Sequence, residues 1–276
     1  MPRYERFDAG DPCWVELATS DPRGSASFYA SVLGWSLQDM GPESGHYHLI
    51  TAGPLDDGDQ ATVGGLGAAD PGQRASWIVY FNAPDLAAAH SRALEAGATA
   101  LVGPDIVMEQ GSMALLADRQ GATFGLWQQA GRRGFDAWGE SGTTAWFELH
   151  TTELDAATEF YGTVSGLVPH PMADTPEFRY NQFAPQPGGV DARFGAFEQS
   201  IDPHPVAGGA APHPAAEWLV YFVTPSVDEA TARAVSLGAE VRGEPADTPF
   251  GRMANLVDPF GAGFCLVEAV DEGGNA

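Results

Sequence analysis

The sequence predicts an α+β protein made of two tandem copies of one module. Four sequence blocks recur in the same order in the two halves of the 276-residue chain. Within each half, segments that alternate in polarity, as strands do, flank segments with helix start and stop signals. This order predicts two βαβββ units per module, four in all, whose curved mixed sheets enclose clefts. Clefts of this kind are suited to small ligands.

The internal repeat sets the module boundaries. The matched blocks are Cys13–Leu17 with Ala145–Leu149, Phe28-Tyr29 with Phe160-Tyr161, Trp77–Phe81 with Trp218–Phe222, and Asp118–Phe124 with Asp258–Phe264. The first two pairs lie 132 residues apart and the last two 141 and 140 apart, so the second copy carries about nine extra residues. We assign these to the Pro- and Gly-rich segment Asp202–Ala215. The Gly-rich stretch Gly131–Gly139 divides the chain into a first module, residues 1–135, and a second, residues 136–276.

The elements of each module follow from local signals. In the first module we expect a strand over Trp14–Thr19, a helix from Asp21-Pro22 to Gly34, strands near Trp35–Asp39, Tyr47–Thr51 and Thr62–Leu66, a strand over Trp77–Phe81, a helix over Asp85–Glu95, and strands near Ala100, Met113–Ala117 and Thr123–Trp127. Asp followed by Pro is a favourable helix start, and Gly34 is a helix stop. In the second module, Thr152-x-x-Asp155 and Ser226-x-x-Glu229 resemble capping boxes. Gly64–Gly67 lacks the last glycine of a dinucleotide fingerprint and indicates a strand in close backbone contact.

Composition excludes several classes of function. The formal net charge is −24, from 37 acidic and 13 basic residues, which argues against nucleic acid and anionic membranes as partners. Every basic residue is Arg, and the absence of Lys removes Schiff-base chemistry. The start of the sequence shows no secretory signal, and two cysteines, Cys13 and Cys265, do not make a disulfide framework. We expect buried thiols and a cytoplasmic, acidic protein.

The repeated motifs resemble one known family. Trp-x-Glu-Leu, Phe-Tyr and Leu33-Gly-Trp35, with the closing Asp258-Pro-Phe-Gly-Ala-x-Phe264, resemble the vicinal oxygen chelate superfamily of glyoxalases, extradiol dioxygenases and bleomycin resistance proteins. The tandem arrangement over nearly the whole chain looks like actinobacterial two-module proteins described as hydroxylases or glyoxalase-like. The resemblance implies the fold but no single function, because this fold serves metal enzymes, metal-free enzymes and drug-binding proteins.

The resemblance also implies a divalent metal, held by His, Gln or Glu on three strands. The first ligand position carries Trp14 and Trp146 in the two copies. The second falls at Ile78 and Leu219, or one residue earlier at Trp77 and Trp218, and the third at Gly125 and Cys265. A single thiolate does not make a site, so the usual ligands are missing and we expect no cofactor.

A displaced metal site remains an alternative. His46 and His48 alternate on one expected strand, as Glu148 and His150 do on another, and together they suggest a site of two His and one carboxylate. The same His46 and His48 also fit half-exposed strand positions. His204 and His213 precede prolines in the Pro-rich segment and fit exposed loop positions better than ligand positions.

Glu16 and Glu148 are the candidate catalytic groups. Each lies two positions after a strand Trp, on the face where the family keeps its ligands. Burial beside an indole raises the pKa of a carboxyl and suits it to act as a general base. The second copy has His150 where the first copy has Ala18. If only one cleft is catalytic, we therefore expect it to be the second, with Glu148 and His150 as the acid–base pair. The alternative is a structural Glu held by a backbone amide or by an Arg such as Arg179 or Arg252.

Matched aromatic residues suggest a ligand-binding surface. We expect a flat, conjugated ligand to contact Trp14, Trp77, Tyr80, Trp146, Trp218 and Tyr221, together with His48. The alternative for strand aromatics is an ordinary core.

Three hypotheses follow. The first is a small-molecule-binding protein, without the usual metal triad, for an aromatic or polyketide-like compound. The second is a metal-independent isomerase, lyase or hydroxylase-type enzyme with Glu148 or Glu16 as general base. The third is a metal-dependent glyoxalase or dioxygenase, which the missing ligands disfavour. Pairing of the two modules within one chain predicts a monomer.

Overall fold

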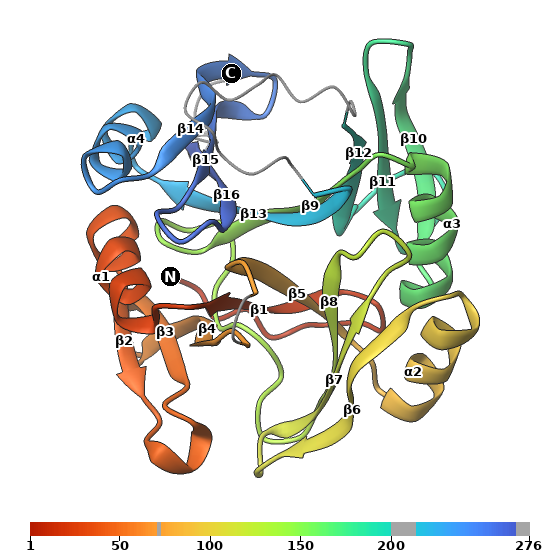
Figure 1. Ribbon diagram of the computed structural model, residues 1–276, viewed down its shortest axis with the longest axis horizontal. Helices are drawn as coiled ribbons and strands as arrows, with labels where there is room; N and C mark the ends of the chain where they lie inside the picture. Colours follow the sequence, from red (N-terminus) through yellow and green to blue (C-terminus); the bar gives the residue numbers. More distant parts are fainter. Residues whose placement is uncertain (71–72, 200–213, 269–276) are drawn as a thin grey trace.

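The computed structural model describes residues 1–70, 73–199 and 214–268. The Pro-rich segment Asp202–Ala215 lies largely outside the described residues. The described chain forms two eight-stranded sheets, one in each module (Figure 1). Among the described residues, no helix combines the length and apolar composition needed to cross a bilayer.

The first module contains two βαβββ units in one sheet. Its elements are β1 Pro12–Thr19, α1 Pro22–Leu33, β2 Ser36–Asp39, the short 3-10 helix η1 Pro42–Ser44, β3 His48–Pro54, β4 Gln60–Ala68, β5 Ser76–Asn82, α2 Leu86–Glu95, β6 Thr99–Val107, β7 Gly111–Ala117 and β8 Thr123–Gln129. The strand order is β2-β3-β4-β1-β5-β8-β7-β6, so the first strands of the two units, β1 and β5, pair at the centre in antiparallel fashion.

The second module repeats this arrangement. Its elements are β9 Thr144–Thr151, α3 Leu154–Ser165, β10 Val168–Asp174, β11 Arg179–Ala184, β12 Phe194–Glu198, β13 Ala216–Thr224, α4 Val227–Ser236, β14 Glu240–Thr248, β15 Gly251–Val257 and β16 Gly263–Glu268. The strand order is β10-β11-β12-β9-β13-β16-β15-β14, with β9 and β13 at the centre. The α+β prediction with two tandem modules is therefore confirmed.

Most of the expected helix signals act as caps. Asp21 accepts a hydrogen bond from the Gly24 amide, Pro22 is the first helical residue of α1, and Gly34 ends the helix with a φ of 73°. Ser226 caps α4 through the Glu229 amide. The capping box expected at Thr152 is wrong: α3 is preceded by Glu153, whose side chain makes no capping hydrogen bond.

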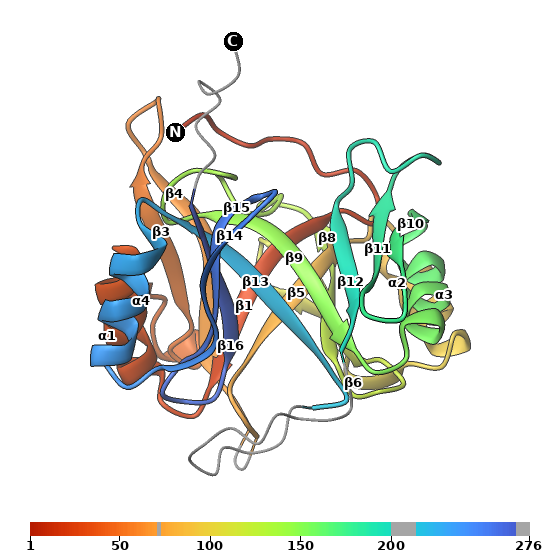
Figure 2. The same cartoon turned by 90° about the horizontal axis from the view of Figure 1, so that it is seen from above.

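The two modules pack against each other through their convex sides. Helix α1 lies beside α4, and α2 lies beside α3, so that each helix pair joins the two modules (Figures 1 and 2). Between them, β5 packs against β13. Aromatic rings fill this core; the Trp77 ring, for example, lies 5.0 Å from the ring of Phe222.

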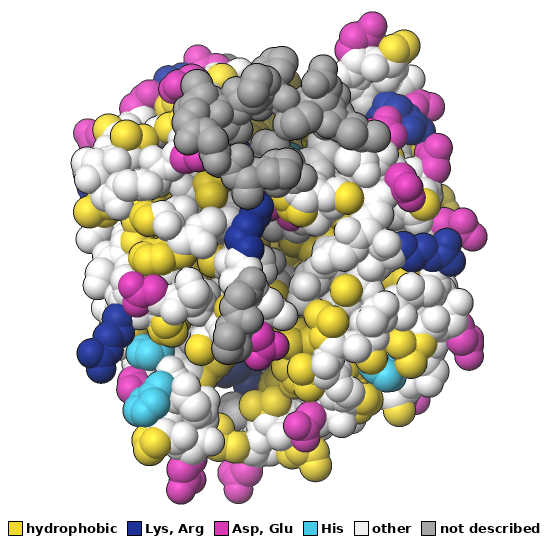
Figure 3. Space-filling view, viewed as in Figure 1, with side chains coloured by type: hydrophobic (Ala, Val, Ile, Leu, Met, Phe, Trp, Pro, Cys, Tyr) yellow, Lys and Arg dark blue, Asp and Glu magenta, His cyan; other side chains and the backbone are white. Residues whose placement is uncertain are grey.

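Both cysteines are buried free thiols, as expected. Cys13 is on β1 and Cys265 on β16, and neither forms a disulfide. Gly64 lies on β4, as expected for a strand in close backbone contact, because a Cβ there would lie 2.9 Å from the Val15 carbonyl oxygen. Acidic side chains are scattered over the face of the molecule shown in Figure 3, where basic ones are few.

Candidate functional site: a cleft in the second module

The second module encloses a cavity of about 550 Å³ on the concave side of its sheet. The central strand β9 supplies its floor, because alternate residues of a strand point to the same face. Trp146, Glu148 and His150 therefore point into the cavity from one strand. The cavity is lined by Ala145, Trp146, Glu148, His150, Met172, Phe178, Tyr180, Gln182, Phe197, Tyr221, Thr248, Pro249, Phe250, Met253 and Val267. Aromatic and aliphatic side chains make most of the wall, as is typical of small-molecule sites.

Glu148 is the centre of a hydrogen-bond network on the cavity floor. Its Oε1 atom lies 2.6 Å from His150 Nε2 and accepts a hydrogen bond of 2.9 Å from the Tyr221 hydroxyl. The Tyr180 hydroxyl also donates to Glu148 and accepts from Trp146 Nε1 at 2.9 Å. These donors come from three strands, β9, β11 and β13, so the sheet itself fixes the position of the carboxylate.

These contacts decide the charge of Glu148. Burial by itself would raise the pKa of its carboxyl, but the hydrogen bond and charge of His150, with the hydrogen bonds from Tyr180 and Tyr221, lower it below the ordinary value. The expectation of a raised pKa is therefore wrong for Glu148, because sequence reasoning left out these donors. An ionised carboxylate therefore lies at the bottom of a mainly apolar cavity.

The first module repeats the network without the histidine. Glu16 Oε2 accepts hydrogen bonds from the Tyr47 hydroxyl at 3.0 Å and from the Tyr80 hydroxyl at 3.3 Å. Trp14 Nε1 donates to the Tyr47 hydroxyl at 3.2 Å. Ala18 takes the place of His150, so no imidazole reaches the carboxyl, and burial raises the pKa of Glu16. The expectation for Glu16 therefore holds.

Close approach of tyrosine to the sheet requires glycine at two matched positions. A Cβ on Gly65 would collide with the Tyr47 hydroxyl, and a Cβ on Gly195 would collide with the Tyr180 hydroxyl. Gly65 lies beside Glu16, and Gly195 beside Glu148, in the parallel ladders. Glycine at these positions therefore leaves the space that each tyrosine hydroxyl needs in order to reach its glutamate.

The other expected aromatic residues divide between two faces. Tyr80 lies on the same face of its sheet as Trp14 and Glu16, and we call this face the first cleft; Tyr221 likewise lines the second cleft. Trp77 and Trp218 point to the core between the modules. Trp77 Nε1 donates to the Tyr29 hydroxyl at 3.1 Å, and both indoles are nearly fully buried. Trp77 and Trp218 thus contribute to the core, which was the alternative reading of the strand aromatics.

The two neighbouring histidines of the first module do not join a cleft. His48 lies opposite Leu66 in the β3–β4 ladder, and Leu66 lies opposite Leu17 of β1, so His48 is on the face of the sheet away from Glu16. His46 lies outside the strand with a φ of 60°, and its Nδ1 is 2.9 Å from Asp39 Oδ2. Neither histidine lies beside Glu148 or His150, which belong to the other module.

The arginines proposed as partners of the two glutamates lie elsewhere. Arg179 forms ion pairs with Asp155, Asp174 and Glu198. Arg252 forms ion pairs with acidic residues of α4 and β14. Tyrosine hydroxyls, rather than arginines, hold Glu16 and Glu148.

The sequence did not identify two tyrosines as partners of the glutamates: Tyr47, which immediately precedes β3, and Tyr180 on β11. It also missed the hairpin side chains Phe178 and Phe250 at the mouth of the second cavity. The 133-residue separation of Tyr47 and Tyr180, close to that of the first matched blocks, is the signal that identifies the first two.

The residues of the clefts do not fit the metal that the fold family implies. The expected ligand positions carry indoles, aliphatic side chains, Gly125 and Cys265, and burial raises the pKa of the Cys265 thiol, which disfavours a thiolate. Among the residues that the structure describes, no group of three or more His, Cys, Asp or Glu side chains is arranged to hold a metal ion.

Comparison with known proteins agrees with this fold. Residues 13–126 match the model of the glyoxalase/bleomycin resistance protein/dioxygenase superfamily, and residues 146–267 match that of the glyoxalase-like domain. The chain is 35% identical to the anthracycline biosynthesis protein DnrV of Streptomyces peucetius, over 95% of this chain and 94% of the relative. It is 30% identical to the putative glyoxylase CFP32 of Mycobacterium bovis, over 97% of this chain and 98% of the relative.

Solved structures show the same fold at low sequence identity. The Mn(II)-bound glyoxalase of Novosphingobium aromaticivorans aligns with a TM-score of 0.60 at 16% identity, over 95% of this chain and 83% of the other. The 2,2',3-trihydroxybiphenyl 1,2-dioxygenase of Sphingomonas wittichii aligns with a TM-score of 0.61 at 14% identity, over 95% and 91%. The chain belongs to the glyoxalase/bleomycin resistance protein/dioxygenase superfamily, as a tandem two-module member.

Proposed function

We propose that this protein binds a flat, conjugated aromatic or polyketide-like compound in the cleft of its second module. The observation that carries the proposal is the cavity of about 550 Å³, with aromatic and methionine walls and a single polar floor. The relative's name, anthracycline biosynthesis protein, supports an aromatic polyketide as the ligand class.

The cavity walls suit a planar ligand. The rings of Phe178 and Tyr180 are parallel within 4°, with centroids 6.0 Å apart. Phe178 and Phe250 are 47% and 54% exposed at the mouth of the cavity. Exposed aromatic rings around a hollow are typical of ligand-binding surfaces, and a stacked ligand would remove them from water.

The polar floor suits hydroxyl and keto groups. The ionised Glu148 accepts hydrogen bonds, while His150, Gln182 and Tyr221 add donors or acceptors at the same end. A ligand phenol is therefore expected to donate to Glu148, while the apolar rings of the ligand contact the walls.

Titration with 1,4-dihydroxyanthraquinone tests this proposal, because its visible absorbance reports binding. Phe250→Ala removes an aromatic surface at the mouth and should weaken binding about tenfold. Met108→Ala, in the corresponding hairpin of the first module, is the matched control and should leave affinity unchanged. Failure of the wild-type protein to bind this compound, or equal effects of the two variants, would contradict the proposal.

The close pair of Glu148 and His150 favours a second function, a metal-independent enzyme of the isomerase, lyase or hydroxylase type. A carboxylate and an imidazole 2.6 Å apart at the end of a cavity can remove a proton from a bound ligand and return it. In this alternative Glu148 accepts the proton as a carboxyl O–H and returns the same proton to the ligand, while the hydrogen bond with His150 Nε2 holds the carboxyl group in position.

Deuterium exchange into an acetyl-substituted hydroxyanthraquinone in D₂O separates the two functions. An enzyme with this base would catalyse exchange, and Glu148→Ala would lose at least about 100-fold in rate while still binding. Glu16→Ala, in the first cleft, is the control. Catalysed exchange that is equally sensitive to both variants would contradict the assignment of Glu148, and the absence of catalysed exchange would favour the binding function.

A further inference from the structure

The two clefts share the Trp-Tyr-Glu-Tyr network but differ at the end where the tryptophan lies. In the second cleft Trp146 is half-buried and lines the cavity. In the first cleft the matched Trp14 is only 8% exposed. The side chains that cover Trp14 therefore distinguish the two clefts.

One difference is on the closing strand of each module. Trp127 on β8 takes the position of Val267 on β16, and Val267 lines the open cavity. A Cβ on Gly111 would lie 2.6 Å from the Trp127 ring, so this glycine lets the indole lie against β7. Trp127 therefore fills space that a smaller valine leaves free in the second module.

The second difference is Arg132, in the linker between the modules. Its guanidinium carbon lies 5.4 Å from the centre of the Trp14 ring, within the range of a cation–π contact. Trp127 Nε1 donates to the Arg132 carbonyl oxygen at 3.0 Å. The indole that fills the cleft therefore also holds the arginine over Trp14.

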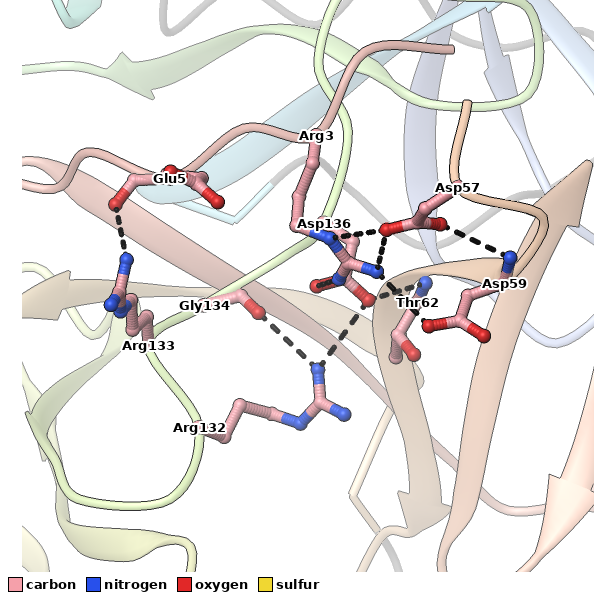
Figure 4. A network of polar contacts seen from close by, with 9 residues as sticks. All are labelled: Arg3, Glu5, Asp57, Asp59, Thr62, Arg132, Arg133, Gly134 and Asp136. Carbon is pink, nitrogen blue, oxygen red and sulfur yellow. Dashed lines mark hydrogen bonds and ion pairs between the residues drawn. The ribbon is translucent and has the colours of Figure 1, made fainter. Parts of the chain in front are cut away.

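Hydrogen bonds hold the linker that carries Arg132 against β4 and against the N-terminal segment (Figure 4). Asp136 accepts hydrogen bonds from the Thr62 amide at 3.0 Å and from Arg3 Nη1 at 3.0 Å. Arg132 Nη1 lies 3.4 Å from the Gly134 carbonyl oxygen and 3.9 Å from Asp136 Oδ2. Arg132 is thus held in place by contacts beyond the one with Trp14.

We propose that Trp127 and Arg132 close the tryptophan end of the first cleft, so that only the second cleft accepts a flat aromatic ligand. The consequence is one ligand per chain despite two copies of the network. Residues 127 and 132 then determine which module binds. The ligand part of this inference rests on the proposed function, whereas the closure of the first cleft does not.

Fluorine NMR of protein labelled with 5-fluorotryptophan tests both parts. Trp14→Phe and Trp146→Phe assign the two resonances. Without ligand, the shift difference between H₂O and D₂O, which reports solvent contact, should be larger for Trp146 than for Trp14. It should increase for Trp14 in Arg132→Ala, and more so in the double variant Trp127→Val/Arg132→Ala. Circular dichroism checks folding, and the single variant provides the test if the double variant does not fold.

Titration with 1,4-dihydroxyanthraquinone then tests the stoichiometry. The wild type should bind one equivalent of the compound, which shifts the fluorine resonance of Trp146 but not that of Trp14. The folded double variant should bind a second equivalent, which shifts the resonance of Trp14. A shift of Trp14 in the wild type would overturn the inference, as would a single equivalent in a double variant whose Trp14 has become exposed. If neither tryptophan responds to the compound, the proposed function fails, and the solvent shifts alone decide whether the two side chains close the cleft.

Discussion

The Tyr29 hydroxyl in the first module donates to Asp258 Oδ2 in the second, over a distance of 3.1 Å. The reciprocal contact joins Tyr161 to Asp118 Oδ2 at 3.0 Å. Both tyrosines come from the Phe-Tyr motif, and both aspartates from the Asp-x-x-Gly turn that closes each module. The repeated motifs thus hold the two modules together.

Loss of either tyrosine hydroxyl should therefore destabilise the protein. Tyr29→Phe removes the contact with Asp258 and leaves the buried Trp77 indole N–H without its acceptor, which costs about 1–3 kcal/mol in the free energy of unfolding. Urea denaturation measures this change. Tyr4→Phe is the control, because its hydroxyl makes no hydrogen bond among the described residues. Equal stability of the two variants would count against the contact.

The same contacts predict a monomer. Since each module already packs against the other within one chain, no second chain is needed to cover the convex sides of the sheets. Sedimentation equilibrium should give the mass of one chain, 29.0 kDa. A stable dimer at micromolar concentration would show that a further surface is buried between chains.

The two glutamates should affect stability in opposite ways as pH changes. The lowered pKa of Glu148 gives stability that is present above the ordinary glutamate pKa and is lost as pH falls through the folded-state pKa. Glu148→Gln should therefore be less stable than wild type at pH 7, and this difference should shrink in acid.

Glu16 provides the matched comparison. Because its pKa is raised, the wild type loses stability as pH rises from the ordinary glutamate pKa through the raised one. Glu16→Gln should remove that loss and be at least as stable as wild type at pH 7. Thermal unfolding between about pH 2.5 and pH 8 covers both transitions, because that of Glu148 lies below the ordinary glutamate pKa and that of Glu16 above it. The same pH dependence in the two variants would contradict the assigned directions.

The two thiols should react only after unfolding. Cys13 and Cys265 are 0% and 3% exposed, and burial raises the pKa of both. Ellman's reagent should label neither in native protein and both in urea. Rapid labelling of Cys265 in native protein would mean that the sheet beneath the second cleft opens enough for the reagent to reach β16.

The sequence predicted the fold well because four repeated blocks report the same strands and helices twice. It also placed Glu148 and His150 together, since alternation along one strand is enough for that. Alternation did not show which face of β5 and β13 bears the cleft, so Trp77 and Trp218 were expected there.

Contacts between distant elements were not predictable in the same way. The tyrosines that hold the glutamates and the linker arginine over Trp14 reach their positions through sheet pairing and backbone path. The charge of Glu148 depends on those partners, which explains why burial alone gave the wrong direction for its pKa.

A crystal structure of the protein with 1,4-dihydroxyanthraquinone tests the central claim most directly. We expect the compound in the second cleft, between Trp146, Phe178 and Phe250, with an oxygen within hydrogen-bond distance of Glu148 or His150. Density for the compound only in the first cleft or on the outer surface, at a concentration that saturates the protein in solution, would contradict the account.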